Sequence, residues 1–194
     1  MPLEQKAKYT HVALDKAYRL EGLVNEFFEI ARYNLQEIRL QNENIDLYYM
    51  LVQMVDEFYP LLSGRGISAT LHADENLTVY GDPVKLARVF NNILKNAVSY
   101  SAPDTQILIS AEKADDAVMV SIQNHGATIP PDKLSAIFEK FYRLDEARST
   151  STGGSGLGLA IAKEIVKSHG GTITAESKEG VTTFTVALPT QTTI

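Results

Sequence analysis

The sequence predicts an α/β fold: a two-layer sandwich with a mixed sheet, preceded by a long helix. Residues 3 to about 42 carry apolar side chains at steps of three, four or seven, which is the period of one face of a helix. The segments 107–111 and 118–122 alternate apolar and polar residues, as half-buried strands do. Because shorter helical and strand-like segments alternate through the rest of the chain, helices and strands are expected to share one sandwich.

The other elements follow from local signals in chain order. The first helix has a wider apolar stripe than a coiled-coil seam, so it is expected to pack in a helical bundle; the alternative is a helix that docks on its own domain. Gly64 and Gly66 end a second helix over 46–63, and Asp82 and Pro83 cap and begin a third. The remaining expected elements are strands at 67–72 and 77–80, a short helix at 132–139, a helix at 156–169, and two final strands around 173–175 and 184–188.

Composition excludes several classes of function. The 194 residues carry a net charge of −6 without long blocks of either sign, which argues against binding to a nucleic-acid backbone. With no Cys, the chain has no disulfide framework, thiolate nucleophile or Cys-ligated zinc, and its four His are scattered without a metal-ligand spacing. Because no apolar stretch is long enough to span a bilayer and no signal peptide is evident, we expect this stretch to be soluble.

The most informative segment is a glycine-rich run, residues 152–159 (TGGSGLGL), that leads directly into a helix. Glycines at a helix N-terminus allow backbone N–H groups to approach an anion, and the helix dipole favours negative charge there. The run therefore predicts a phosphate site. Spacing excludes a Walker loop, a dinucleotide fingerprint and a nucleophile elbow around Ser155, because each needs another residue where Leu157 or Leu159 stands. A flexible loop without a ligand remains the alternative.

The third helix carries a second candidate site. Asn92 and Asn96 fall one turn apart, on the side away from its apolar stripe of Leu86, Val89, Phe90, Ile93, Leu94 and Ala97. Two amide oxygens at this spacing suit Mg²⁺, which prefers oxygen ligands and keeps waters and substrate phosphates in its other positions. For an isolated pair, two ordinary solvated side chains are the alternative interpretation.

Four segments together resemble the catalytic domains of sensor histidine kinases, which have a GHKL-type ATP-binding fold. They are residues 92–97 (NILKNA), similar to the N box of that family, 138–143 (FEKFYR), similar to its F box, 154–159 (GSGLGL), similar to its G2 box, and Gly180 with 183–189 (TFTVALP), similar to its closing strand. The segments occur in the family's order, and the likeness covers about residues 45–190. Within the family, residues 46–54 and 136–145 most resemble the vancomycin-resistance sensor kinases.

The resemblance implies a role for each matching residue. Asn92 and Asn96 would face Mg²⁺, Asn96 most directly, and with Arg143 near the phosphates they would form the catalytic set. The residues that would contact ATP are Lys95, Tyr100, Asn124, Gly126, Thr128, Ile129, Phe141, Gly154, Gly156, Leu157 and Gly158. The polar segment 143–155 would be a lid over the nucleotide, in agreement with its composition.

Two positions depart from the family's pattern. Where the G1 box usually reads Asp-x-Gly-x-Gly, residues 124–128 read Asn-His-Gly-Ala-Thr. The amide of Asn124 still accepts a hydrogen bond from the adenine amino group, but it carries no charge and can flip, so weaker adenine binding is expected. Ser99 stands where a Lys or Arg often lies beside the phosphates, and the alternative replacements are Lys95, Arg143 and Arg148.

The N-terminal arm, residues 1–43, resembles the second helix of the family's dimerisation and phosphoacceptor domain; residues 44–190 would be the catalytic domain and 191–194 a tail. The acceptor His belongs on the preceding helix, where an acidic residue and a Pro follow it. Because His11 has neither, it is expected to be an ordinary surface residue. The intact parent is expected to be a homodimeric, membrane-bound sensor whose cytoplasmic portion includes this chain.

The sequence thus predicts a protein-histidine kinase that uses ATP and Mg²⁺, with neither nucleic acid nor membrane as a partner of this chain. The parent would transfer the γ-phosphoryl group to a His, from which the receiver domain of a response regulator takes it. This chain alone would bind ATP without phosphorylating itself. Two alternatives remain open: a nucleotide-sensing or inhibitory module of the same fold, and a structural dimerisation piece without Mg²⁺-dependent nucleotide binding.

Overall fold

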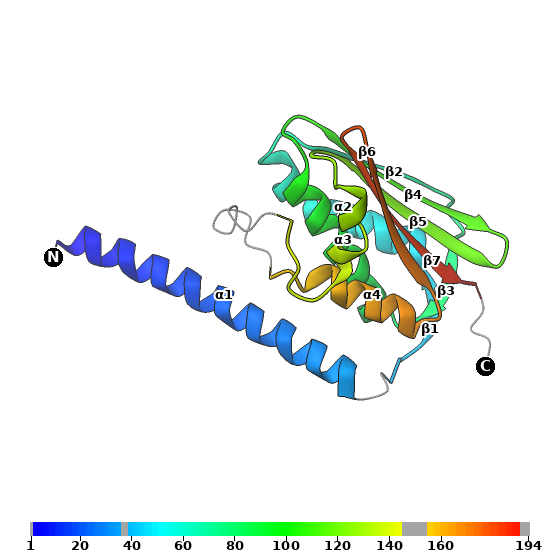
Figure 1. Ribbon diagram of the computed structural model, residues 1–194, viewed down its shortest axis with the longest axis horizontal. Helices are drawn as coiled ribbons and strands as arrows, with labels where there is room; N and C mark the ends of the chain where they lie inside the picture. Colours follow the sequence, from blue (N-terminus) through cyan, green and yellow to red (C-terminus); the bar gives the residue numbers. More distant parts are fainter. Residues whose placement is uncertain (1, 36–38, 145–154, 191–194) are drawn as a thin grey trace. The chain divides into compact units, whose positions relative to one another are not determined.

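The computed structural model describes residues 2–35, 39–144 and 155–190, which fall into two compact units (Figure 1). The first unit, Met1–Ile38, contains one helix, and the second, Arg39–Ile194, contains all the other described elements. Within the described ranges, none of the helices is long and apolar enough to cross a membrane.

Helix α1, Leu3–Leu35, is shorter than the sequence predicts. The expected helix continues to about residue 42, whereas residues 39–42 are not helical. These residues belong to the second unit, where the backbone N–H of Gln41 donates to Oδ2 of Asp82 at 3.1 Å. The N–H of Gln41 thus pairs with a residue far along the chain instead of a helical carbonyl. The spacing of apolar residues around position 41 gives no sign of such a long-range contact.

Large apolar side chains of α1 are exposed wherever the structure describes their burial. They are Tyr9, Val12, Leu14, Tyr18, Leu20, Val24 and Phe28. A single helix cannot bury such a stripe within its own unit.

The second unit is built on a five-stranded sheet in the order β2-β4-β5-β7-β6. Strand β2 (Ser68–Ala73) is parallel to β4 (Gln106–Ala114). All other neighbours in this sheet are antiparallel and involve β5 (Ala117–His125), β7 (Val181–Pro189) and β6 (Thr172–Lys178). The predicted mixed sheet and the predicted hairpin of β4 and β5 are therefore confirmed.

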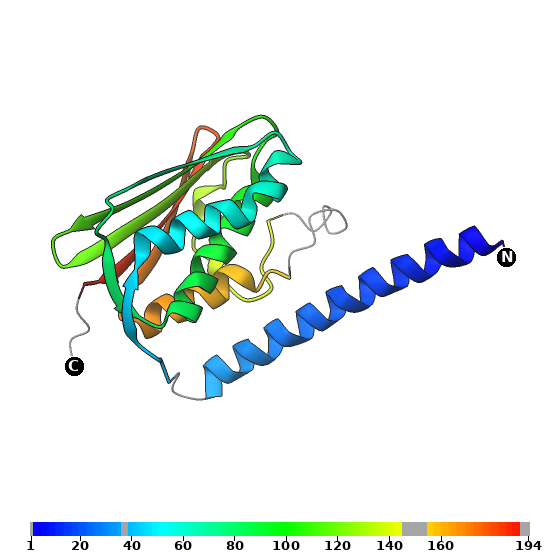
Figure 2. The ribbon, with the colours of Figure 1, turned by 180° about the vertical axis from the view of Figure 1, so that it is seen from behind.

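Three helices cover one face of this sheet: α2 (Leu47–Ser63), α3 (Pro83–Tyr100) and α4 (Gly158–Ser168) (Figure 1, Figure 2). The core lies between the two layers. Its largest fully buried side chains are Leu47, Leu51, Leu86, Phe90, Ile93, Leu94, Ile107, Ile109, Ile122, Leu157, Ile161 and Phe184. The predicted apolar stripe of the third helix is buried in full, and the predicted two-layer sandwich is confirmed.

One strand was not predicted. β1 (Glu43–Asp46) pairs antiparallel with β3 (Thr78–Gly81) and forms a small second sheet, with Ile45 opposite Val79. Ile45 is the one buried residue of β1, so the strand lacks the alternation that would reveal it.

The helix predicted over 132–139 is wrong. The segment forms two short 3-10 turns, Pro131–Lys133 and Ala136–Phe138. Its buried residues, Ile137 and Phe138, are adjacent in sequence and give an α-helix no continuous apolar stripe to bury.

Asp82 joins three segments at the start of α3. Its Oδ1 accepts from the N–H of Lys85 at 3.1 Å, which caps α3 as predicted, and its Oδ2 accepts from Gln41. Its own N–H donates to Nε2 of His169 at 3.0 Å, and Nδ1 of His169 donates to the carbonyl of Ile165 in α4 at 2.8 Å. Because a carbonyl oxygen only accepts, the ring carries its proton on Nδ1. His169 therefore fixes the start of α3 against the end of α4.

Replacing His169 by Leu is expected to lower the free energy of unfolding of the second unit by about 1–3 kcal/mol, because the buried N–H of Asp82 loses its acceptor. Urea denaturation followed by circular dichroism measures the change. The matched control is His72→Leu on β2, whose side chain is exposed. An equal loss in both variants would mean that the hydrogen bonds of His169 add no stability.

Candidate functional site

Helices α3 and α4 meet where the glycine-rich run ends. Nδ2 of Asn92 donates to the carbonyl oxygen of Gly158 at 3.0 Å. The two residues are packed together, since a Cβ added to Gly158 would lie 3.6 Å from the Asn92 amide. Gly158 is the first residue of α4, so the half-buried Asn92 lies beside the N-terminus of that helix. The structure thus brings together two candidates that lie 66 residues apart in sequence.

Asn96 follows Asn92 by one turn of α3 and is half-buried, whereas Lys95 is exposed. Among the described residues, the side chain of Asn96 has no hydrogen-bond partner. Because Nδ2 of Asn92 is engaged by Gly158, Oδ1 of Asn92 and the amide oxygen of Asn96 remain as acceptors on this side of the helix. No cluster of three or more His, Asp or Glu in the described part of the chain could hold a metal ion. The amide oxygens of Asn92 and Asn96 are an oxygen donor set that fits Mg²⁺.

The glycine-rich run is tied to the segment that resembles the F box. The N–H of Phe141 donates to the carbonyl of Gly156 at 3.0 Å. Gly156 has a φ of +75°, and an added Cβ would lie 2.9 Å from the carbonyl carbon of Phe141, so this position needs glycine. The side chain of Phe141 is exposed, while Leu157 is buried in the core. Gly154 and the other residues of 145–154 lie outside the described residues.

The N-terminus of α4 has the features of an anion site. The first N–H groups of any α-helix lack partners within the helix. Leu157, which precedes α4, provides no side-chain cap for them. Such N–H groups and the positive end of the helix dipole favour a negatively charged ligand beside Asn92.

A second group of predicted residues lies where β5 ends. Asn124 is 3% exposed and is in register with Thr182 of β7, which is in register with Ser177 of β6. The hydroxyl oxygens of Ser177 and Thr182 are 2.8 Å apart, and Ser177 Oγ accepts from the N–H of Ile129 at 2.9 Å. A row of polar side chains thus crosses three strands on the face that carries the core. Thr182 and Ser177 are not among the predicted residues, because nothing in the local sequence distinguishes them from other Thr and Ser residues of strands.

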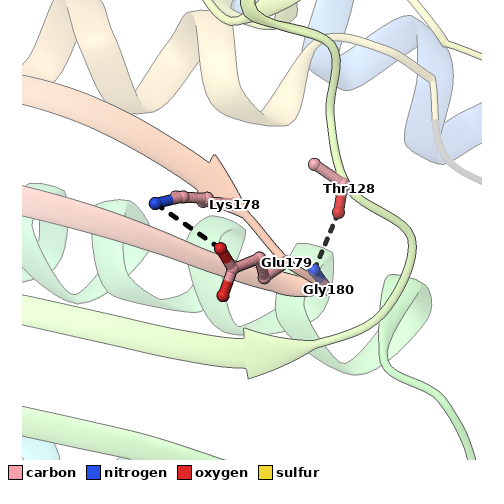
Figure 3. A network of polar contacts seen from close by, with 4 residues as sticks. All are labelled: Thr128, Lys178, Glu179 and Gly180. Atoms are coloured by element: carbon pink, nitrogen blue, oxygen red, sulfur yellow. Dashed lines mark hydrogen bonds and ion pairs between the residues drawn. The ribbon is translucent and has the colours of Figure 1, made fainter.

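The turn after β5 is held from two sides. Gly126 forms an isolated antiparallel bridge with Ser101, and a Cβ added to Gly126 would overlap the carbonyl oxygen of Tyr100. On the other side, the N–H of Gly126 donates to the carbonyl of Gly180 at 2.8 Å. The N–H of Gly180 in turn donates to Oγ1 of Thr128 at 2.8 Å (Figure 3). Thr128, where the family's pattern has Gly, therefore adds a hydrogen bond to the β6–β7 turn.

The described residues place the predicted site residues in two groups along α3. The group at the start of α4 consists of Asn92, Phe141, Gly156, Leu157 and Gly158, and the group at the end of β5 consists of Tyr100, Asn124, Gly126, Thr128 and Ile129. Arg143 is half-buried, two residues after Phe141. Asn92 in the middle of α3 and Tyr100 at its end connect the two groups.

Comparison with known proteins identifies the family of this chain. Residues 81–192, which contain both groups, match the family of histidine kinase-, DNA gyrase B- and HSP90-like ATPases. The chain belongs to this ATPase family. The chain is 65% identical over 189 residues to the sensor protein VanS of Enterococcus faecium, across 97% of this chain and 49% of VanS. It is 46% identical over 182 residues to the sensor protein VanSC of Enterococcus gallinarum, across 94% of this chain and 50% of that protein. The chain thus spans about half the length of these curated relatives.

The fold of the chain is similar to those of solved histidine kinase structures. One is full-length ShkA in complex with AMPPNP, with a TM-score of 0.83 and 27% identity across 97% of this chain and 39% of ShkA. Another is ThkA in complex with the response regulator protein TrrA, with a TM-score of 0.78 and 25% identity across 98% of this chain and 53% of that chain. The predicted family and fold are confirmed.

Proposed function

We propose that this chain is the ATP-binding catalytic region of a sensor histidine kinase of the VanS type, with part of its dimerisation helix. The match to the ATPase family and the 65% identity to VanS support this function. The observation that carries it is the hydrogen bond from Asn92 to Gly158. It brings the amide-bearing side of α3 to the N-terminus of α4, where a phosphate group would bind.

The two groups of residues suit the two ends of MgATP. At the start of α4, backbone N–H groups donate to phosphate oxygens. Asn96 and Asn92 would hold Mg²⁺, which when bound neutralises negative charge on the phosphates, and Arg143 would add a positive charge. At the end of β5, Asn124 would pair with the base, and Tyr100 would line its site.

The residues of this chain position the reactants and stabilise charge. In the parent, a His nitrogen forms a bond to the γ-phosphorus while the bond to the bridging oxygen breaks, and ADP leaves with the electron pair. An Asp of the response regulator then takes the phosphoryl group from the His. Because phosphoryl transfer has a loose transition state with charge on the phosphoryl oxygens, positioning and electrostatic stabilisation carry the catalysis. The acceptor His would come from another helix rather than from His11.

The proposed function also implies partners for the parent protein. The exposed apolar side chains of α1 support a homodimer formed through a helical hairpin in the parent. A VanR-like response regulator would be the next acceptor, as the ThkA–TrrA complex suggests by similarity. The parent would be a membrane-bound sensor with this chain on its cytoplasmic side.

Calorimetric titration and a transfer assay test the function. We expect the chain to bind ATP more tightly with Mg²⁺ than without it. We also expect it to label a separately purified acceptor-helix hairpin of VanS from radiolabelled ATP while remaining unlabelled itself. Binding without transfer would indicate a nucleotide-sensing module instead. Absence of Mg²⁺-dependent ATP binding, or steady labelling on His11, would contradict the proposal.

A further inference from the structure

The amide of Asn124 is buried, but no neighbour fixes its orientation. Its side chain has no hydrogen-bond partner among the residues that the structure describes. The hydroxyl of Thr182, opposite it in register, is paired with Ser177 instead. In contrast, the amide of Asn92 is oriented by its bond to Gly158. With no partner among the described residues, the Asn124 amide can pair with a bound ligand through either its oxygen or its nitrogen.

A carboxamide is complementary to two kinds of purine. Its oxygen accepts from the 6-amino group of adenine while its nitrogen donates to N1. After half a turn about the Cβ–Cγ bond, its nitrogen donates to O6 of a 6-oxopurine while its oxygen accepts from the N1–H. The nearby hydroxyls of Thr182 and Ser177 do not oppose this turn, because a hydroxyl group rotates to donate or to accept.

A carboxylate at the same position would behave differently. An ionised Asp, which the family's pattern usually has here, only accepts hydrogen bonds. It pairs with the 6-amino group of adenine but places negative charge against O6 of a 6-oxopurine. Sites reject an analogue strongly when it leaves a buried polar group unpaired, and a carboxamide that turns over leaves none.

We propose that Asn124 makes this nucleotide site tolerant of the group at the 6-position of the purine. A 6-oxopurine triphosphate then binds with an affinity close to that of ATP. This inference rests on the proposed function, which places the base of a purine nucleoside triphosphate at Asn124.

Titration calorimetry with ATP and with inosine triphosphate, both with Mg²⁺, tests the proposal. Inosine triphosphate is the probe because it has an oxo group in place of the 6-amino group and lacks the 2-amino group of guanine. For the unaltered chain, the two dissociation constants are expected to lie within about tenfold, because each base finds two partners on Asn124. In Asn124→Asp, the ratio of the inosine to the adenosine constant is expected to rise by about 10- to 100-fold, mainly through weaker binding of inosine triphosphate.

The matched control is Gln123→Glu, the same amide-to-carboxylate change on the preceding residue of β5. Successive side chains of a strand point to opposite faces, so this change lies on the open face of the sheet and should leave the ratio unaltered. If the inosine-to-adenosine ratio of dissociation constants in the unaltered chain is above about 100, the inference is wrong. The proposed function still stands in that case, because ATP binds. An unaltered ratio in a folded Asn124→Asp also overturns the inference. Failure of both nucleotides to bind overturns the proposed function, and this inference with it.

Discussion

The Asn96→Ala variant is expected to lose the Mg²⁺-dependent part of ATP binding. Asn96 is half-buried on α3, one turn beyond Asn92, and its amide has no partner among the described residues. Losing an oxygen ligand from a site with so few protein ligands is expected to weaken Mg²⁺-dependent ATP binding by about 100-fold or more. Titration calorimetry with ATP at several Mg²⁺ concentrations measures the effect.

Asn91→Ala provides the matched control, because it removes an amide from the same helix five residues away. A shift of five residues turns the side chain to another face of α3, so this variant should retain Mg²⁺-dependent binding. The urea denaturation midpoint of both variants shows whether α3 remains folded. If Asn96→Ala responds to Mg²⁺ as strongly as the unaltered chain does, Asn96 is not a ligand of the metal.

The Gly126→Ala variant is expected to lower the free energy of unfolding of the second unit by about 3 kcal/mol, the upper end of the usual cost of overpacking. An added Cβ would overlap the carbonyl oxygen of Tyr100, and a backbone atom cannot move aside as the end of a flexible side chain can. The end of α3 and the bridge between Ser101 and Gly126 would have to separate. Because this displacement moves the site residue Tyr100 relative to Asn124, ATP affinity is expected to fall as well.

The matched control for Gly126→Ala is Gly64→Ala. Gly64 has a right-handed φ of −62°, and its added Cβ would come no closer than 3.4 Å to another atom. This control is expected to change stability by less than about 1 kcal/mol. Chemical denaturation compares the stability of the two variants, and titration calorimetry without denaturant compares their affinity for ATP. Similar stability of the two variants would show that the turn at Gly126 accommodates an added methyl group without a loss in the free energy of unfolding.

Local patterns were sufficient where an element carries its own signal. The apolar stripe of α3, its cap at Asp82 and the alternation in β4 and β5 depend on residues close together in sequence, and all were predicted. The strand β1 was missed because its pairing with β3, rather than its own side chains, makes it a strand. The end of α1 was misplaced because Gln41 is held by Asp82.

The candidate site shows the same division. Motif spacing identified the amides of α3 and the glycines before α4, but their roles as ligands of Mg²⁺ and ATP remain predictions. Thr182 and Ser177 were missed because a Thr or Ser in a strand has no local feature that distinguishes a buried site residue from an ordinary one. Their position beside Asn124 follows from the registers of β5, β7 and β6.

The sequence by itself determined the family, the sandwich and most element types, because periodicity and motif spacing depend on neighbouring residues. The tertiary structure alone decided which polar groups meet. Asn92 pairs with Gly158 across 66 residues, and Asp82 pairs with His169 across 87. Such contacts arise only when packing of the core sets the positions of whole helices and strands, and that packing depends on the shapes of many buried side chains at once.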